Sequence, residues 1–355
     1  MTSDLASVSA PVSGGATGGP GPRSGLWRAA LRWEGALVLV LVAVVLFGAA
    51  ESSTFLTPTT FFYLGTDIGY IAIMALPMTL IVMTGEIDLS VASALGLSGA
   101  TVGYLWHHGW GIWPAVLAAL LVGALGGLLN GVLVAKAGLP SIAVTIGTLT
   151  LYRGLSEVLL GSMTVPSAGD RQFPTSLTNI GVVPVPGTQL SYSLLFFLVL
   201  AVVFGILLHA TPTGRSLVAI GLQPEAARFV GIRVNRIKLV LYIVSGVMCA
   251  FAGVLLTLQN ASVSYNAGYG LELTVVAIVL FGGVSIFGGR GSILGVVLSV
   301  LIVGALQMVL TQMNVDPNVQ NIVTGVLLLL SVIIPNGGEV VRRARARMRR
   351  LSAGG

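Results

Sequence analysis

Residues 211–238 read TPTGRSLVAIGLQPEAARFVGIRVNRIK and separate two long apolar segments of the chain. One acid, Glu225, stands in this stretch against five basic residues: Arg215, Arg228, Arg233, Arg236 and Lys238. A positive excess of this kind is typical of a loop on the cytoplasmic side of a membrane. The stretch therefore predicts a polytopic membrane protein with a cytoplasmic loop over 211–238.

The same loop contains the signals of a short helix over 224–231. Pro224 suits the first turn of a helix, and Gly231 suits the residue that ends one. Three apolar residues fall on one face of this helix: Ala226, Phe229 and Val230. We expect a membrane protein that presents such a face to the cytosol to bind a soluble partner there.

The composition agrees with an all-α polytopic membrane protein. The 355 residues are 55% hydrophobic and only 8% charged, whereas soluble domains carry roughly 25% charged residues. The single cysteine, Cys249, excludes an internal disulfide, and its apolar surroundings predict a buried small side chain. The net charge of +6 comes from residues that flank apolar segments, which argues against nucleic-acid binding.

The hydropathy pattern predicts about ten transmembrane helices with both termini in the cytoplasm. The expected helices cover residues 35–50, 61–84, 89–106, 112–135, 140–160, 190–210, 238–258, 271–288, 292–312 and 319–335. With this topology, Lys136, the 211–238 loop, Arg290 and the basic C-terminal tail all lie in the cytoplasm. In the fourth helix, glycines at short spacing predict close packing of helices in lipid: Gly123, Gly126, Gly127 and Gly131.

The chain divides into two tails and one membrane domain. Residues 1–32 are rich in Gly, Ser, Pro and Ala and predict a disordered cytoplasmic tail, and 33–337 form the transmembrane domain. A cleaved signal peptide is the alternative for the N-terminal region. Residues 338–355 form a basic cytoplasmic tail, which either anchors the topology or binds acidic lipid headgroups.

Several charged residues fall inside or beside the expected helices, where charges are costly and often functional. Asp88 either caps the third helix or belongs to a solute pathway, and Glu86 precedes it. Arg153 and Glu157 stand four residues apart on one helix face, which predicts a local ion pair; a contact with an outer partner or gate is the alternative.

The chain shows no pattern that predicts catalysis or nucleotide binding. Residues 281–291 contain five glycines, but no Lys and no preceding strand, so they do not form a phosphate loop. The three histidines, His107, His108 and His209, lack the neighbours that a metal site needs. We therefore expect no metal site and no enzymatic activity on this chain.

Four motifs in a fixed order resemble the permease subunits of ABC importers, and most closely the branch that imports ribose and related monosaccharides. They cover 214–221 with 225–232, 85–90, 146–148 with 152–154, and 280–283 through 288–292. The likeness extends from about residue 60 to about residue 335. It implies an ABC importer permease-like helical bundle in the plasma membrane of a bacterium.

The resemblance also implies roles for particular residues. Coupling to an ATPase falls on Gly214, Arg215, Glu225, Ala226, Ala227, Arg228 and Gly231. A translocation pathway or gate falls on Glu86, Asp88, Ser90, Thr148, Arg153, Phe281, Gly282 and Gly283. Glu86 departs from the glycine that is usual in this family motif.

The partners implied by the resemblance are a cytoplasmic ABC ATPase, an extracytoplasmic sugar-binding protein that meets the loop 161–189, and a second permease copy or a related chain. ATP and Mg²⁺ would bind to the ATPase, so no cofactor is expected on this chain. An ion-coupled secondary transporter of a small polar solute is the main alternative, and a membrane enzyme or sensor is a weaker one.

Overall fold

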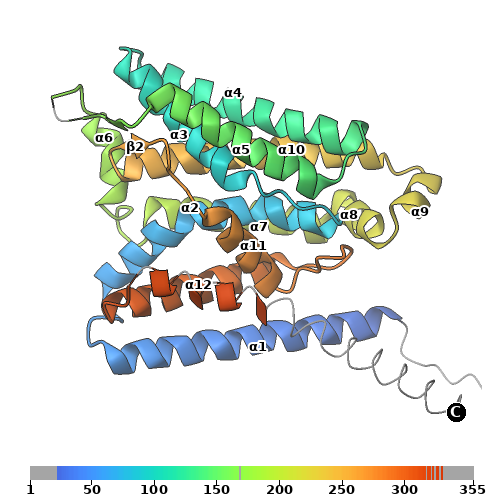
Figure 1. Cartoon of the computed structure of the whole chain (residues 1–355). Coiled ribbons are helices and arrows are strands. Elements are labelled where there is room, and N and C mark those ends of the chain that lie inside the picture. Colours follow the sequence, from blue (N-terminus) through green and yellow to red (C-terminus); the bar gives the residue numbers. More distant parts are fainter. Residues whose placement is uncertain are drawn as a thin grey trace, which may run out of the picture.

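The computed structural model describes residues 22–167, 169–316, 318–320, 322–323, 325–327 and 329–330. Helices dominate this part of the chain (Figure 1). They are α1 (Pro22–Glu51), α2 (Pro58–Met83), α3 (Val91–His107), α4 (Ile112–Gly131) with the π-helical turn η1 (Val132–Lys136), α5 (Ser141–Leu160), α6 (Thr175–Thr178), η2 (Asn179–Gly181), α7 (Tyr192–Ala210), α8 (Pro212–Leu222), α9 (Pro224–Phe229), α10 (Val234–Gln259), α11 (Leu271–Phe281) and α12 (Ile293–Gln312).

Six helices of the described chain are long and apolar enough to cross a membrane, which confirms the helical membrane class. They span Trp33–Glu51, Pro58–Met83, Ile112–Lys136, Tyr192–Ala210, Val234–Gln259 and Ile293–Gln312. The expected number of ten transmembrane helices and the cytoplasmic position of both termini stay predictions. The last expected helix, 319–335, is described only in part, and the tail 338–355 lies outside the described residues.

Helix α2 occupies the centre of the bundle and is buried along almost its whole length. It packs against α7, α10, α11 and α12. Two glycines allow α7 to approach closely, since a Cβ at Gly69 would lie 2.6 Å from the Cβ of Ser193, and one at Gly65 would lie 2.7 Å from the Ser191 hydroxyl. Although Pro77 stands inside it, α2 is one continuous helix.

The glycines of α4 pack as the sequence predicts. A Cβ at Gly127 would lie 2.2 Å from the carbonyl oxygen of Tyr242, and one at Gly123 would lie 2.4 Å from that of Gly246. Backbone therefore meets backbone between α4 and α10, as is usual where small residues line helix contacts in lipid. Gly126 instead faces α5, where the Tyr152 hydroxyl donates a hydrogen bond to its carbonyl oxygen at 2.9 Å.

The structure departs from the expected organisation at three places. Helix α1 begins at Pro22, inside the stretch 1–32 that was expected to be disordered; residues 1–21 lie outside the described residues. Helix α11 ends at Phe281 instead of residue 288, because Gly283, Gly288 and Gly289 adopt positive φ angles that a helix does not contain. The loop 211–238 contains an additional helix, α8, before the expected one.

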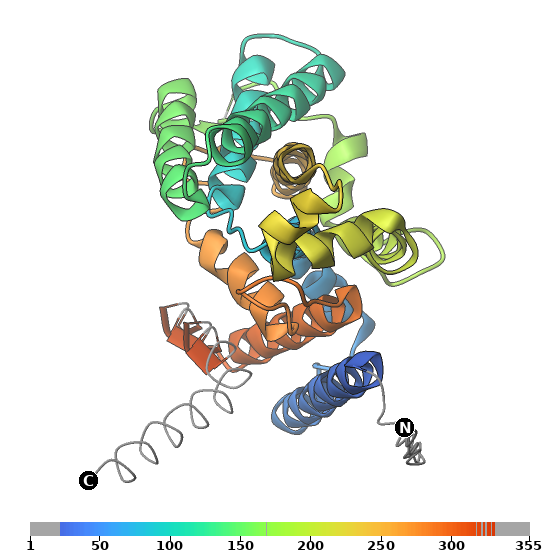
Figure 2. The ribbon, with the colours of Figure 1, turned by 90° about the vertical axis from the view of Figure 1, so that its right-hand side faces the viewer.

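The bundle has two distinct ends. Helices α8 and α9 lie at one of them, called here the α9 end, and Figure 2 views the molecule from that side. The opposite end contains the α3–α4 and α10–α11 connections and a short antiparallel pair of strands, β1 (Thr164–Val165) and β2 (Val263–Ser264). Long helices thus separate two surfaces, each built from connecting segments.

The α4–α10 contact supplies a test of the packing. Replacing Gly127 with Leu should lower the apparent melting temperature of the detergent-solubilised protein by roughly 5 °C, because overpacking costs about 1–3 kcal/mol and each kcal/mol shifts melting by about 2–4 °C. Gly147→Ala is the matched control, since no atom lies within 4 Å of a Cβ added there. Equal melting of both variants in a fluorescence-detected thermal scan would contradict this packing.

Candidate functional site

The helix α9 forms within the boundaries that the sequence predicts. Pro224 lies in its first turn, and Gly231, with a φ of 83°, follows its end. Ala227 is buried between α9, α8 and the start of α10. The remaining apolar side chains point away from the bundle, and Phe229 is 91% exposed and Val230 76% exposed. Exposed apolar side chains of this kind are typical of a surface that binds another protein.

The charged residues around this tip are placed on its surface. Arg215 and Glu225 are exposed, and Arg228 donates a hydrogen bond to the Asn235 side chain at 3.1 Å, which joins α9 to α10. Gly214 is buried in the first turn of α8, where a Cβ would lie 1.7 Å from the carbonyl oxygen of Leu208 in α7. The predicted coupling residues, 214–231, therefore form one continuous module at the α9 end.

A junction of glycines connects this module to the centre of the bundle. Gly221, at the end of α8, packs so closely that a Cβ there would lie 1.9 Å from the carbonyl oxygen of Met83 and 2.2 Å from the amide nitrogen of Gly289. The Gly289 amide donates a hydrogen bond to that same Met83 carbonyl at 2.8 Å. The glycine junction (Gly221, Gly288, Gly289 and the end of α2 at Met83–Gly85) thus joins three segments through their backbones.

Glu86 lies next to this junction and forms a hydrogen-bonded ion pair with Lys238 of α10. The two side chains are only 18% and 13% exposed. Lys238 lies in the second turn of α10, so the pair links the α2–α3 connection to the helix that follows the coupling module. The sequence does not predict that these two residues meet, since 152 positions separate them.

Asp88 is buried and accepts three hydrogen bonds from serines. The Ser90 amide and hydroxyl donate to it at 3.0 and 2.6 Å, and the Ser245 hydroxyl donates at 3.1 Å. Asn130 in turn donates to the Ser90 hydroxyl at 2.8 Å. The cap of α3 is Ser90, so the prediction that Asp88 takes this position is wrong, although its carboxylate does accept a backbone bond at the helix start.

Arg153, Thr148 and the segment 281–283 belong to other elements than Asp88. Arg153 lies about 18 Å along α5 from Ser141, the first residue of that helix, at 1.5 Å per residue. Thr148 is buried between these points and donates a hydrogen bond within its own helix to the carbonyl of Val144. Phe281, Gly282 and Gly283 lie against α1 and α12. The structure therefore distributes these candidates over three places in the fold.

Arg153 does not pair with Glu157, so that prediction is wrong. Its guanidinium donates to the carbonyl oxygens of Ala267 and Gly268 at 2.8 and 3.0 Å, and lies 3.8 Å from the Glu272 carboxylate. Glu157 lies about one helical turn from Arg153 on the same face of α5. The α10–α11 connection, however, presents two carbonyl oxygens to Arg153, and Glu272 at the start of α11 presents a carboxylate. Arg153 thus holds that connection from α5.

The segment 281–292 closes the α9 end against α1. Trp33 donates a hydrogen bond to the carbonyl of Phe281 at 3.2 Å, and Ser292 donates to Glu34 at 2.6 Å. A Cβ at Gly282 would lie 2.8 Å from Val296, which explains why α11 can cross α12 so closely. These contacts support a structural role for 281–283.

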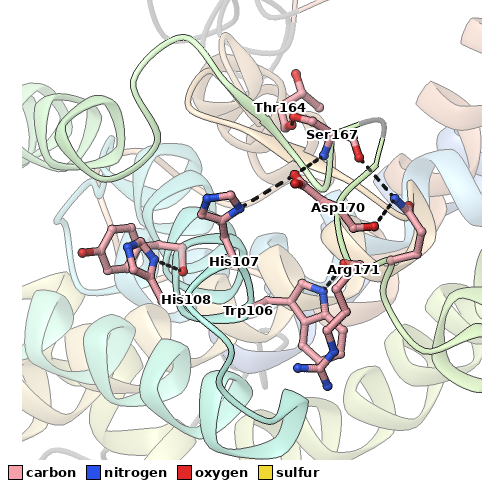
Figure 3. A network of polar contacts seen from close by, with 9 residues as sticks. Trp106, His107, His108, Thr164, Ser167, Asp170 and Arg171 are labelled. Carbon is pink, nitrogen blue, oxygen red and sulfur yellow. Dashed lines mark hydrogen bonds and ion pairs between the residues drawn. The ribbon is translucent and has the colours of Figure 1, made fainter.

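The loop 161–189 is fastened to the end of α3 by a polar network at the opposite end (Figure 3). Trp106 donates to the carbonyl of Arg171 at 2.7 Å, and the Arg171 guanidinium stacks 3.7 Å from the Trp106 ring. Asp170 lies 3.7 Å from His107 and accepts the Ser167 amide bond at 2.8 Å. An acid does therefore stand beside His107, contrary to expectation, but no group of three metal-binding side chains occurs among the described residues.

A cavity of about 380 Å³, which the sequence did not predict, lies at this same end of the bundle. Its lining comes from α2, β1, the end of α10, the connection after α10 and the start of α11. The polar residues around it are Tyr70, Thr164, Thr257, Asn260, Ser262, Ser264, Asn266 and Tyr269. Polar residues at alternate positions between two apolar helices are the signal that could have indicated it: Asn260, Ser262, Ser264 and Asn266.

Comparison with known proteins defines the class of this protein. Residues 60–332 match the family of branched-chain amino acid transport system permease components. The chain therefore belongs to this permease family and is a multi-pass protein of the plasma membrane.

Individual relatives agree with this class. The autoinducer 2 import system permease LsrD of Klebsiella pneumoniae is 34% identical over 305 residues, covering 85% of this chain and 91% of the relative. LsrD of Escherichia coli K12 and that of Shigella flexneri are each 35% identical over 303 residues, with the same coverage. These matches confirm the resemblance to sugar-importing ABC permeases. No solved structure matches the chain significantly.

The ion pair between Glu86 and Lys238 can be tested by a double-mutant cycle. Glu86→Gln and Lys238→Met should each destabilise the solubilised protein, because each leaves a charge with little access to water. The double variant should recover about 1–2 kcal/mol relative to the sum of the single effects. Chemical denaturation in detergent measures this coupling, and Glu51→Gln, which removes an exposed acid, is the control. Additive single effects would show that the two charges do not interact.

Proposed function

We propose that this chain is the permease subunit of an ATP-driven importer that carries a monosaccharide into the cell. The single observation that carries the proposal is the apolar tip of α9, which exposes Phe229 and Val230 at the α9 end of the bundle. Folded membrane proteins rarely leave such side chains in contact with water unless a partner covers them. The partner we propose is a separate cytoplasmic ATPase, which binds ATP and Mg²⁺.

The contacts of α9 supply a mechanical route from that partner to the membrane helices. The ATPase would grip α9 through Ala226, Phe229 and Val230, with Arg215, Glu225 and Arg228 around them. Movement of α8 and α9 then reaches α2 through the glycine junction and reaches α10 through Glu86 and Lys238. ATP binding and hydrolysis would in this way switch a two-state bundle between outward and inward access.

Two further partners belong to the proposal. A sugar-binding protein would deliver substrate to the end that contains the loop 161–189, and a second copy or a related permease would complete the pathway. The monosaccharide is proposed because the relatives at 34–35% identity import autoinducer 2, and the motifs resemble the ribose branch. The family description names branched-chain amino acids, which are therefore the substrate class to test against.

The coupling role of α9 can be tested with two substitutions that introduce the same charge. Phe229→Asp should abolish co-purification of the ATPase subunit with this chain and should abolish uptake, because it places a carboxylate in the apolar contact. Gln223→Asp is the matched control: it adds the same charge at the N-cap of the same helix, where Asp is favoured. It should leave both properties unchanged.

A backbone variant completes this test. Gly231→Pro removes the positive φ angle that ends α9, and should abolish uptake while the protein stays in the membrane. Normal uptake by Phe229→Asp or Gly231→Pro, with the ATPase still bound, would show that α9 does not couple the two subunits. Uptake that survives loss of the ATPase but fails without an ion gradient would favour an ion-coupled transporter instead.

A further inference from the structure

The cavity near the β1–β2 strands has the size of a small-molecule site. Its volume is about 380 Å³, and ligand sites usually measure roughly 300–1,000 Å³. It opens at the end of α10 that is remote from α9, since α10 begins directly after the coupling loop and is 26 residues long. A ligand in this cavity would lie about 39 Å from the coupling module, at 1.5 Å per helical residue.

The lining offers hydrogen bonds without charge. None of the residues that line the cavity is an Asp, Glu, Lys, Arg or His; the Arg153–Glu272 pair lies behind the lining. The side-chain amide of Asn260 and the hydroxyl of Tyr70 make no hydrogen bond within the described chain, and Asn266 uses only its carbonyl oxygen, which accepts the Ser264 hydroxyl bond at 2.7 Å. Donors and acceptors are thus left available to a ligand, as binding sites for neutral polar molecules require.

Apolar groups share the lining with these polar ones. Leu256, Val263 and Leu271 contribute aliphatic surface, and Tyr70 and Tyr269 contribute aromatic rings. A monosaccharide presents hydroxyl groups around its edge and C–H bonds on its ring faces, so it matches both kinds of surface. A free amino acid would instead bring an ammonium and a carboxylate, and this lining supplies no opposite charge for either.

The wall formed by the α10–α11 connection is held in place from two sides. Arg153 of α5 fixes the carbonyls of Ala267 and Gly268, and its guanidinium lies 5.2 Å from the centre of the Tyr269 ring. On the other side, Ser264 pairs with Thr164 across the two strands. The cavity wall is therefore preorganised, which lowers the cost of ordering it around a ligand.

We propose that this cavity binds the transported monosaccharide on its way into the membrane pathway, with Asn260 and Asn266 as hydrogen-bonding residues and Arg153 as a positioning residue. This inference rests on the proposed function, because it assigns the substrate of that importer to a site on this chain. It adds a place where the permease itself contacts the sugar, separate from any site on a binding protein.

Cysteine protection provides the test, because the one native thiol, Cys249, is buried. Ser262→Cys places a thiol in the cavity, and Ser53→Cys places one on an exposed residue at the same end of the bundle. Each variant, in lipid nanodiscs, is labelled with a polar fluorescent maleimide. The probes are autoinducer 2, D-ribose, D-xylose, D-galactose, L-rhamnose and L-leucine.

The expected result is that at least one sugar slows labelling of Ser262→Cys and leaves Ser53→Cys unaffected. A sugar at ten times its dissociation constant should slow labelling about tenfold. Adding Asn260→Ala to Ser262→Cys should weaken this protection about tenfold, as expected for the loss of one hydrogen bond. Asn179→Ala, an exposed amide outside the cavity, is the matched control.

Each other outcome overturns the inference and also separates it from the proposed function. If no sugar slows labelling of Ser262→Cys, the cavity is not a sugar site. If cells with the intact transporter nevertheless take up the sugar, the proposed importer function is kept and only the cavity assignment is lost. Protection by L-leucine without protection by any sugar overturns both the cavity assignment and the monosaccharide substrate. Equal protection of Ser53→Cys would reveal a general effect on the label.

Discussion

The contact between the coupling module and the end of α2 is made by backbone atoms. Gly221 fits between the carbonyl of Met83 and the amide of Gly289, and any side chain at this position would collide with both. Because backbone cannot repack as side chains do, a displacement of α8 would be transmitted to the end of α2.

Helix α2 then connects this junction to the far end of the bundle. It is 26 residues long and continuous, and its buried surface contacts α7, α10, α11 and α12. Tyr70, midway along it, lines the cavity near the β1–β2 strands. A shift of α2 at Met83 would therefore change the packing beside that cavity. Helix α2 thus connects the two ends of the molecule physically.

Sequence alone predicted the elements whose limits are set locally. Pro224 and Gly231 mark α9 because each constrains its own backbone. Hydropathy located the long helices because a membrane span needs about 20 consecutive apolar residues, which can be read from the sequence directly. Arg153 was assigned the wrong partner, since helix spacing identifies Glu157 as a neighbour but cannot show that Ala267 and Gly268, more than a hundred residues later, present their carbonyls to it. The cavity was missed because its residues are ordinary individually and meet only through the fold.

The surroundings of Asp88 bear on how the proposed importer is driven. Both oxygens of Asp88 accept hydrogen bonds, from Ser90 at the start of α3 and from Ser245 of α10, so this carboxylate ties the two helices together. The nearby ion pair of Glu86 and Lys238 is likewise satisfied within the chain. Both acids fasten the α2–α3 connection to α10, the helix that follows α9, so a force applied at the exposed tip of α9 would reach the centre of the bundle through them.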